Sequence, residues 1–165
     1  MKKTGIFYGT NTGTTEDVAH RIAKELGVAD ADIHNVADTA PDVLGDYDVI
    51  VIGTPTWGSG EIQEDFYDFL DGAQVLDLKG HKIALFGLGD ESMYDTFCNG
   101  LGTLYDKLKD TGADFVAVPD AKPYHYAHST ALRDGHFVGM VLDEQNHPEL
   151  TDARIASFAL AVESL

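Results

Sequence analysis

Residues 5–16, near the N-terminus, read GIFYGTNTGTTE. The first four residues of this stretch form a short apolar run, typical of a strand that is buried on both faces of a parallel sheet. Glycines and short hydroxyl side chains follow, and then a segment with Val18, Ile22 and Leu26 at helical spacing. A strand, a tight loop and a helix in this order predict the first βα unit of an α/β protein.

The same alternation continues along the chain. Branched apolar runs recur at 49–52 and 83–86, with a weaker one at 33–36. Helical spacing is found at 62–70, at 101–108 and at 155–162, and a shorter helix is expected to begin at Pro41. This pattern predicts a doubly wound parallel sheet with right-handed crossovers and helices on both faces.

One region interrupts the alternation. The run 115–118 is expected to be the fifth strand, but residues 119–136, rich in His, Tyr and Asp, separate it from another apolar run at 137–142. We interpret the two runs as parts of one edge strand that flank an insertion. Because no repeat, linker or low-complexity tract is found, residues 1–165 are expected to form a single domain.

Composition narrows the functional classes. The 165 residues include 28 acidic and 11 basic ones, a formal net charge of −17. This charge repels nucleic acids and anionic membranes, and it favours a basic partner protein. Cys98 is the only cysteine, so no intramolecular disulfide can form, and the N-terminus has no long apolar segment typical of a signal peptide. We expect a cytoplasmic protein without a metal site, since His125 and His128 lack further ligands nearby.

In doubly wound sheets ligands bind where the strand order reverses, beyond the carboxyl ends of the strands. The loop after the first strand combines glycines, four threonine hydroxyls and the free N–H groups of a helix start, and residues 9–20 contain no Lys or Arg before Arg21. Neutral donors of this kind favour a single terminal phosphate, although an ordinary Thr-rich helix cap is an alternative.

The loops after the third and fourth strands each carry an aromatic side chain. Trp57, the only Trp, is followed by Gly58 and Gly60, and it could cover a flat ring or the edge of the core. Asp90 could bond the polar edge of a ring or its own loop. Tyr94 offers a second flat face. Together the three loops predict a site for a phosphorylated planar cofactor.

Three motifs carry a family resemblance. Thr10-x-Thr12-Gly13-x-Thr15, then Pro55-Thr56-Trp57, then Gly89-Asp90 followed by Tyr94 resemble the three FMN loops of the flavodoxins. The insertion and residues 136–152 resemble the long-chain subgroup. The resemblance implies a flavodoxin-like five-stranded parallel sheet of order 2-1-3-4-5. It also implies a low-potential one-electron carrier rather than an enzyme, with non-covalent FMN cycling between semiquinone and hydroquinone and shuttling electrons from reductases to acceptor enzymes.

By this resemblance the residues 10–15 would hold the phosphate, while Trp57 and Tyr94 would sandwich the isoalloxazine. The full set of expected FMN-binding residues is Thr10, Asn11, Thr12, Gly13, Thr14, Thr15, Pro55, Thr56, Trp57, Gly58, Ser59, Gly60, Leu88, Gly89, Asp90, Tyr94 and Cys98. Gln145 stands where relatives often have an acid near the ribityl chain. The expected partners are basic-surfaced redox proteins, and the expected state is a monomer.

Two rival functions share this fold. An NAD(P)H-dependent FMN or quinone reductase would use the same cofactor, but it needs an open ring face for hydride transfer, which two covering aromatics would block. A signalling receiver domain needs paired acids after the first strand and a phosphorylatable Asp after the third. The loops here read Gly-Thr-Asn-Thr and Thr-Pro-Thr-Trp instead.

Overall fold

The computed structural model describes residues 3–93, 95–118 and 124–165 of the chain. At its centre is a parallel sheet with strands in the order β2, β1, β3, β6 and β10, and with β7 also paired to β6. The bounds are β1 Thr4–Tyr8, β2 Ile33–Asn35, β3 Val49–Thr54, β6 Lys82–Leu88, β7 Asp114–Phe115 and β10 Met140–Leu142. This order confirms the predicted doubly wound sheet.

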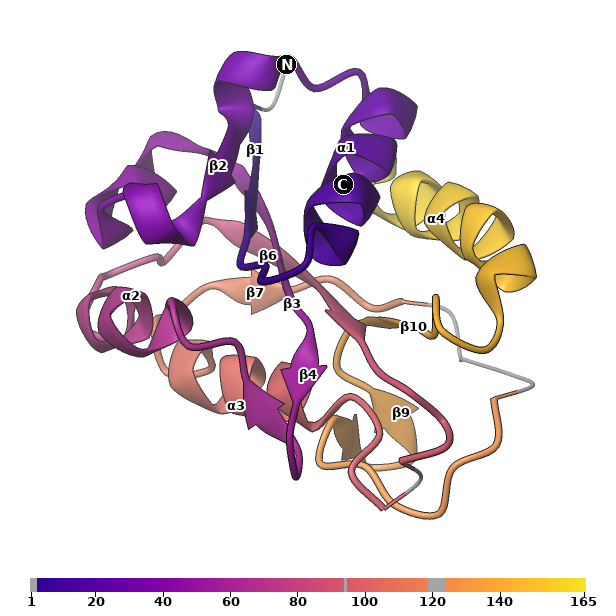
Figure 1. Cartoon of the computed structure of the whole chain (residues 1–165). Coiled ribbons are helices and arrows are strands. Elements are labelled where there is room, and N and C mark those ends of the chain that lie inside the picture. The colour runs from indigo at the N-terminus through magenta and orange to yellow at the C-terminus, as the bar shows by residue number, and fades with distance from the viewer. Residues whose placement is uncertain (1–2, 94, 119–123) are drawn as a thin grey trace.

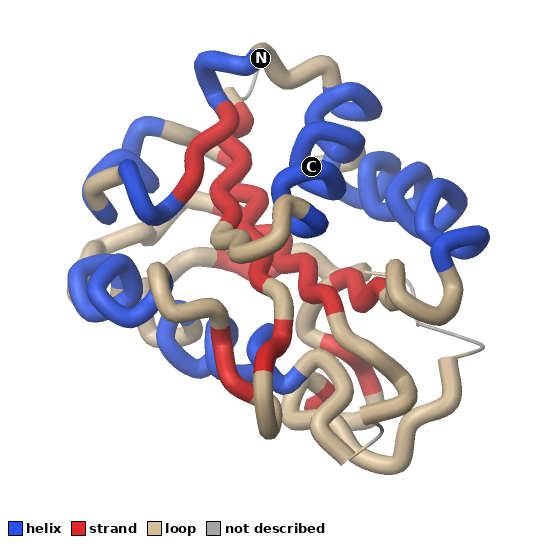
Figure 2. The backbone as a smooth tube through the Cα atoms, viewed as in Figure 1, coloured by secondary structure: helices blue, strands red, loops and turns tan. Residues whose placement is uncertain are grey.

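Helices cover both faces of the sheet. They are α1 Thr14–Leu26, α2 Phe66–Ala73, α3 Asn99–Leu108 and α4 Pro148–Glu163. Figures 1 and 2 show α1 and α4 on one face and α2 and α3 on the other, which agrees with the two hydrophobic cores. Within the part of the chain that the structure describes, every helix is too short or too polar to span a lipid bilayer.

The central strand β3 explains why the apolar runs lack polar alternation. Val49 and Val51 point into the core under α1 and α4, whereas Ile50 and Ile52 point into the core under α2 and α3. All six residues of β3 are buried. A strand buried on both faces carries apolar side chains on both, as the run at 49–52 predicted.

The edge of the sheet is divided between two segments. Ile83 of β6 pairs with Phe115 of β7, and Phe86 farther along β6 pairs with Met140 of β10, both in parallel. The two strands therefore extend along the same side of β6. This arrangement confirms the interpretation of one edge strand in two parts that flank an insertion.

At the start of the run 137–142 the prediction was wrong in one respect. Phe137 belongs to a hairpin of β8 Leu132–Arg133 and β9 His136–Phe137, where it pairs with Leu132, and does not continue into β10. The two-residue loop is Asp134-Gly135, with φ angles of 53° and 82°. Positive φ at both positions is typical of the tight turns that close two-residue hairpins, so this turn pairs Phe137 with Leu132, and the edge strand begins only at Met140.

Two further elements differ from expectation. Ile62 was predicted to begin a helix, but it lies in a hairpin of β4 Thr56–Trp57 and β5 Glu61–Ile62, and α2 begins only at Phe66. The glycine-rich turn after Trp57 reverses the chain, so Ile62 is buried as part of strand β5 and not as part of a helix. The short helix expected at Pro41 is a 3₁₀ helix, Pro41–Asp46; two more 3₁₀ turns are Asp30–Asp32 and Val36–Asp38.

Candidate functional site

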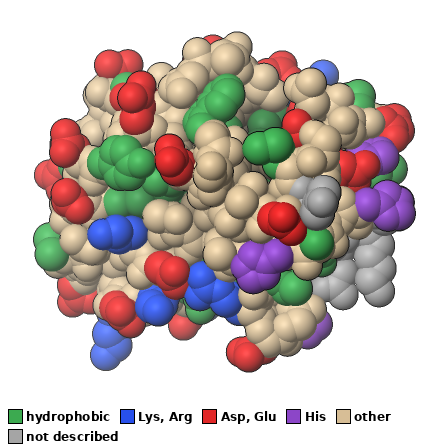
Figure 3. All heavy atoms as spheres, turned by 60° about the horizontal axis from the view of Figure 1, so that its bottom comes forward, with side chains coloured by type: hydrophobic (Ala, Val, Ile, Leu, Met, Phe, Trp, Pro, Cys, Tyr) green, Lys and Arg blue, Asp and Glu red, His purple; other side chains and the backbone are tan. Residues whose placement is uncertain are grey.

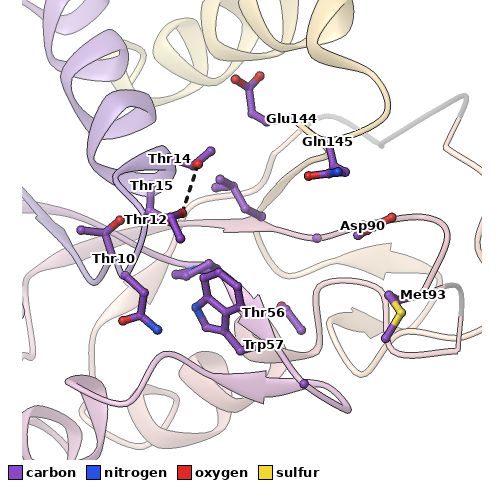
Figure 4. Close-up of a pocket in the computed structure, with 15 residues that line it drawn as sticks. Thr10, Thr12, Thr14, Thr15, Thr56, Trp57, Asp90, Met93, Glu144 and Gln145 are labelled. Carbon is purple, nitrogen blue, oxygen red and sulfur yellow. Dashed lines mark hydrogen bonds between the residues drawn. The ribbon is translucent and has the colours of Figure 1, made fainter.

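A pocket of about 500 Å³ lies beyond the carboxyl ends of β1, β3, β6 and β10 (Figure 4). Its position agrees with the expectation for a doubly wound sheet. The lining residues come from four loops and are Thr10, Asn11, Thr12, Thr14, Thr15, Pro55, Thr56, Trp57, Gly58, Leu88, Gly89, Asp90, Met93, Glu144 and Gln145. Among the described residues, none that lines the pocket is Lys or Arg.

Most of the residues expected from the sequence are therefore brought together. Gly13, Ser59 and Gly60 belong to the same loops but do not line the pocket. Cys98 is fully buried behind it, where burial raises the pKa of its thiol well above the ordinary value. Tyr94 lies outside the described residues.

The loop between β1 and α1 forms one end of the pocket. Gly13 is the residue that precedes α1, and its N–H donates to Thr10 Oγ1 at 3.0 Å. The first intrahelical bond of the helix is donated by Asp17 N to Gly13 O, so the N–H groups of residues 14–16 are left for another acceptor. These groups and the positive end of the helix dipole create a site for an anion.

Thr15 provides the clearest sign that this end of the pocket is built for a ligand. Its side chain is 1% exposed, and its Oγ1 has no hydrogen-bond partner within the described part of the chain. A buried hydroxyl normally has a partner, because leaving it unpaired costs about 1–3 kcal/mol. The nearby Glu16 carboxylate is held by the Tyr8 hydroxyl at 2.6 Å, and burial together with this bond raises the pKa of Tyr8 to about 12.

Trp57 stands at the tip of the β4–β5 hairpin. Thr56 pairs with Ile62 and Trp57 with Glu61, and Gly60 N donates to Trp57 O at 3.1 Å across the turn. Trp57 is 37% exposed and lines the pocket, next to the β1–α1 loop in Figure 4. An aromatic face that remains this exposed beside an anion site can cover a planar ligand.

The loop after β6 forms the opposite end. Asp90 Oδ1 accepts bonds from the backbone N–H and hydroxyl of Ser92, at 2.8 and 2.5 Å, and from Asn146 Nδ2 at 2.7 Å. The Ser92 hydroxyl bond is the main cause that holds the pKa of Asp90 below its usual value. Asp90 thus bonds its own loop, one of the two roles expected, while it also lines the pocket.

Two lining residues, Met93 and Glu144, were missed. Glu144 follows β10, and Arg21 Nη1 of α1 approaches its Oε2 at 3.1 Å, while Arg21 Nη2 donates to Asp152 at 2.6 Å. The guanidinium therefore offsets the carboxylate charge close to the anion site. Glu144 could have been predicted from the rule that ligands bind beyond the carboxyl ends of the strands. Because β10 pairs with β6 in parallel, the residues that follow β10 reach the same edge of the sheet as those that follow β6.

The described part of the insertion packs against Phe97 and contributes no residue to the pocket lining. The rings of Phe97 and Tyr126 are stacked with centroids 5.3 Å apart, and Tyr124 and Phe137 also contact Phe97. No group of three or more His, Cys, Asp or Glu side chains that could hold a metal is found within residues 3–93, 95–118 and 124–165.

Comparisons with known proteins agree with this geometry. The family model described as Flavodoxin matches residues 6–158. "Flavodoxin 1" of Salmonella typhimurium is 41% identical over 164 residues, covering 98% of this chain and 93% of that protein, and the flavodoxin of a Nostoc species is 40% identical, covering 99% and 96%. The K13G mutant of Fusobacterium nucleatum flavodoxin, solved with flavin mononucleotide, superposes with a TM-score of 0.92 at 31% identity, covering 99% of this chain and 96% of the other. The chain therefore belongs to the flavodoxin family.

Proposed function

We propose that this chain is a low-potential one-electron carrier that binds FMN non-covalently in the pocket described above. The observation that carries the proposal is the buried Thr15 hydroxyl, which lacks a partner among the described residues and belongs to a residue that lines a pocket without a described Lys or Arg. Fusobacterium nucleatum flavodoxin, which has the same fold, is bound to flavin mononucleotide. The residues present fit that cofactor.

The N–H groups of residues 14–16 and the threonine hydroxyls would hold the phosphate. Hydrogen bonds to a charged group are stronger than those between neutral groups, and the dipole of α1 adds to them. The site contains no cation among the described lining residues that could act on a transferable phosphoryl group. Its donors suit a terminal phosphate that stays in place.

Trp57 would cover one face of the ring, and by family resemblance Tyr94 would cover the other. Bound FMN supplies the capacity to take up and release electrons one at a time. The Asp90 carboxylate repels further negative charge in the pocket. No Lys or Arg among the described lining residues offsets that repulsion. These residues would therefore lower the potential at which a second electron is accepted, as a strong donor requires.

The surface supports a basic redox partner. The net charge is −17, and acidic side chains lie around much of the face shown in Figure 3. Opposite charges steer association and raise its rate. We further propose that the chain acts as a monomer in the cytoplasm, that residues 1–165 form one domain, and that the insertion between β7 and β10 places it in the long-chain subgroup.

A titration of the apoprotein with FMN tests this proposal. Trp57 is the only Trp, so its emission reports on the site without ambiguity. We expect one FMN per chain, strong quenching, and weaker binding of riboflavin, which lacks the phosphate. Equal affinities for FMN and riboflavin would contradict the phosphate site. Steady NADPH oxidation by the purified protein alone would instead support the reductase alternative, which the flavodoxin relatives do not favour.

A further inference from the structure

Gln63 connects the β1–α1 loop to the β4–β5 hairpin, two segments that line the pocket, without lining the pocket itself. Its backbone follows β5, the return strand of the Trp57 hairpin, and its side chain is fully buried. The side-chain Nε2 donates to Asn11 Oδ1 at 2.8 Å, in the loop between β1 and α1. The buried side-chain amide of Gln63 therefore joins the β1–α1 loop to the β4–β5 hairpin that carries Trp57.

Both polar atoms of the Gln63 side chain, and its backbone N–H, have hydrogen-bond partners. Nε2 also donates to Asp65 Oδ2 at 2.7 Å, Oε1 accepts from Asp65 N at 3.1 Å, and the Gln63 backbone N donates to Thr54 Oγ1 at 3.3 Å. A Cβ at Gly9 would lie 2.3 Å from Gln63 Oε1, so the first loop starts with the residue that leaves room for this side chain.

We propose that Gln63 is a positioning residue that couples the phosphate subsite to the ring subsite. The proposal rests on the proposed function, because it concerns how that pocket takes up FMN. A buried amide that loses a partner carries a free-energy penalty, so Asn11 and the hairpin cannot change position independently. Ordering of the first loop by an anion therefore also orders the hairpin that presents Trp57. By reciprocity, the two subsites strengthen each other.

The test measures this coupling in the apoprotein with separate probes. Riboflavin affinity is measured by Trp57 emission with and without saturating inorganic phosphate. We expect phosphate to raise the riboflavin affinity of the unmodified chain about fivefold or more. Gln63→Leu has a side chain of similar size that cannot donate a hydrogen bond. In this variant the ratio of the riboflavin affinities with and without phosphate should fall to within about twofold of unity. Gln74→Leu, at an exposed position after α2, is the matched control and should keep the full factor.

A second variant guards against loss of folding. Asn11→Ala removes the acceptor from an exposed position, and it should abolish the coupling as Gln63→Leu does. In the double variant the coupling should be no weaker than in either single one, since both remove the same bond. If Gln63→Leu does not fold, Asn11→Ala decides alone.

The outcomes separate the two proposals. A normal phosphate effect in folded Gln63→Leu or in Asn11→Ala would overturn the positioning role, and so would tight FMN binding by an unmodified chain whose riboflavin affinity ignores phosphate. Failure to bind FMN at all would overturn the proposed function and the coupling with it. A separate readout uses hydrogen exchange: the amides of residues 10–16 should exchange faster in apo Gln63→Leu than in the unmodified apoprotein.

Discussion

Replacing Thr15 by Val should change stability and cofactor binding in opposite directions. Thr15 is buried, and its hydroxyl has no partner within the described residues. Valine has nearly the same shape and is also β-branched, so the first turn of α1 is preserved. Removing an unpaired buried hydroxyl should raise the free energy of unfolding of the apoprotein by about 1 kcal/mol. Removing a donor to a charged phosphate should cost about 1.5–3 kcal/mol of FMN binding.

The binding loss corresponds to a dissociation constant roughly 10- to 150-fold higher. It is measured by Trp57 emission with FMN, while riboflavin affinity should change less than about twofold because riboflavin carries no phosphate. Stability is measured by urea unfolding of the apoprotein. Equal losses for FMN and riboflavin, or an unchanged FMN affinity, would refute the assignment of this hydroxyl to the phosphate.

Two matched threonines serve as controls. Thr151 is buried, and its Oγ1 likewise lacks a partner in the described part of the chain, but it does not line the pocket. Thr151→Val should therefore raise stability and leave FMN binding unchanged. Thr111 is buried, but its hydroxyl donates to Leu108 O at 2.7 Å. Thr111→Val should lower stability by about 1 kcal/mol, again without an effect on FMN.

Three further predictions concern the turn, the surface and pH. Gly58→Ala should lower the free energy of unfolding by about 1 kcal/mol, because Gly58 has a φ of 53°, whereas Gly45→Ala, without positive φ, should not. Electron transfer with a basic reductase should slow steeply as salt is added, since charge steering is screened beyond about 8 Å at physiological ionic strength; a rate independent of salt would leave the acidic surface without this role. Glu91 and Glu149 raise the pKa of His147, so its contribution to stability is present below the unfolded pKa, near 6.5, and is lost as pH rises through the folded value. In His147→Gln the free energy of unfolding, measured in urea, should depend less on pH over that range. An unchanged pH dependence would count against the ion pairs of His147 with Glu91 and Glu149.

Much of the fold followed from local pattern. The apolar runs at 49–52 and 83–86 predicted strands buried on both faces, and the helical spacing of Val18, Ile22 and Leu26 predicted α1. The rule that ligands bind at the carboxyl ends of such strands then identified the three loops. Because both signals are local, they need no knowledge of tertiary contacts.

The misses came from short elements and from long-range pairing. Strands of two residues, such as β4 and β5, carry too little periodicity to be found, so Ile62 was assigned to the following helix. The Asp134-Gly135 hairpin signal was present in the sequence and was overlooked. Glu144 reaches the pocket only because β10 pairs with β6, and the buried Gln63 bond to Asn11 likewise joins residues far apart in sequence.

The most direct test of the account is a reductive titration of the FMN-loaded protein against dyes of known potential. Because Asp90 and the lack of a lining cation in the described pocket oppose added negative charge, we expect two separated one-electron steps, with the second at a lower potential than in free FMN. A single two-electron step at the potential of free FMN, or a protein that retains no flavin, would contradict the claim that this chain is a one-electron carrier.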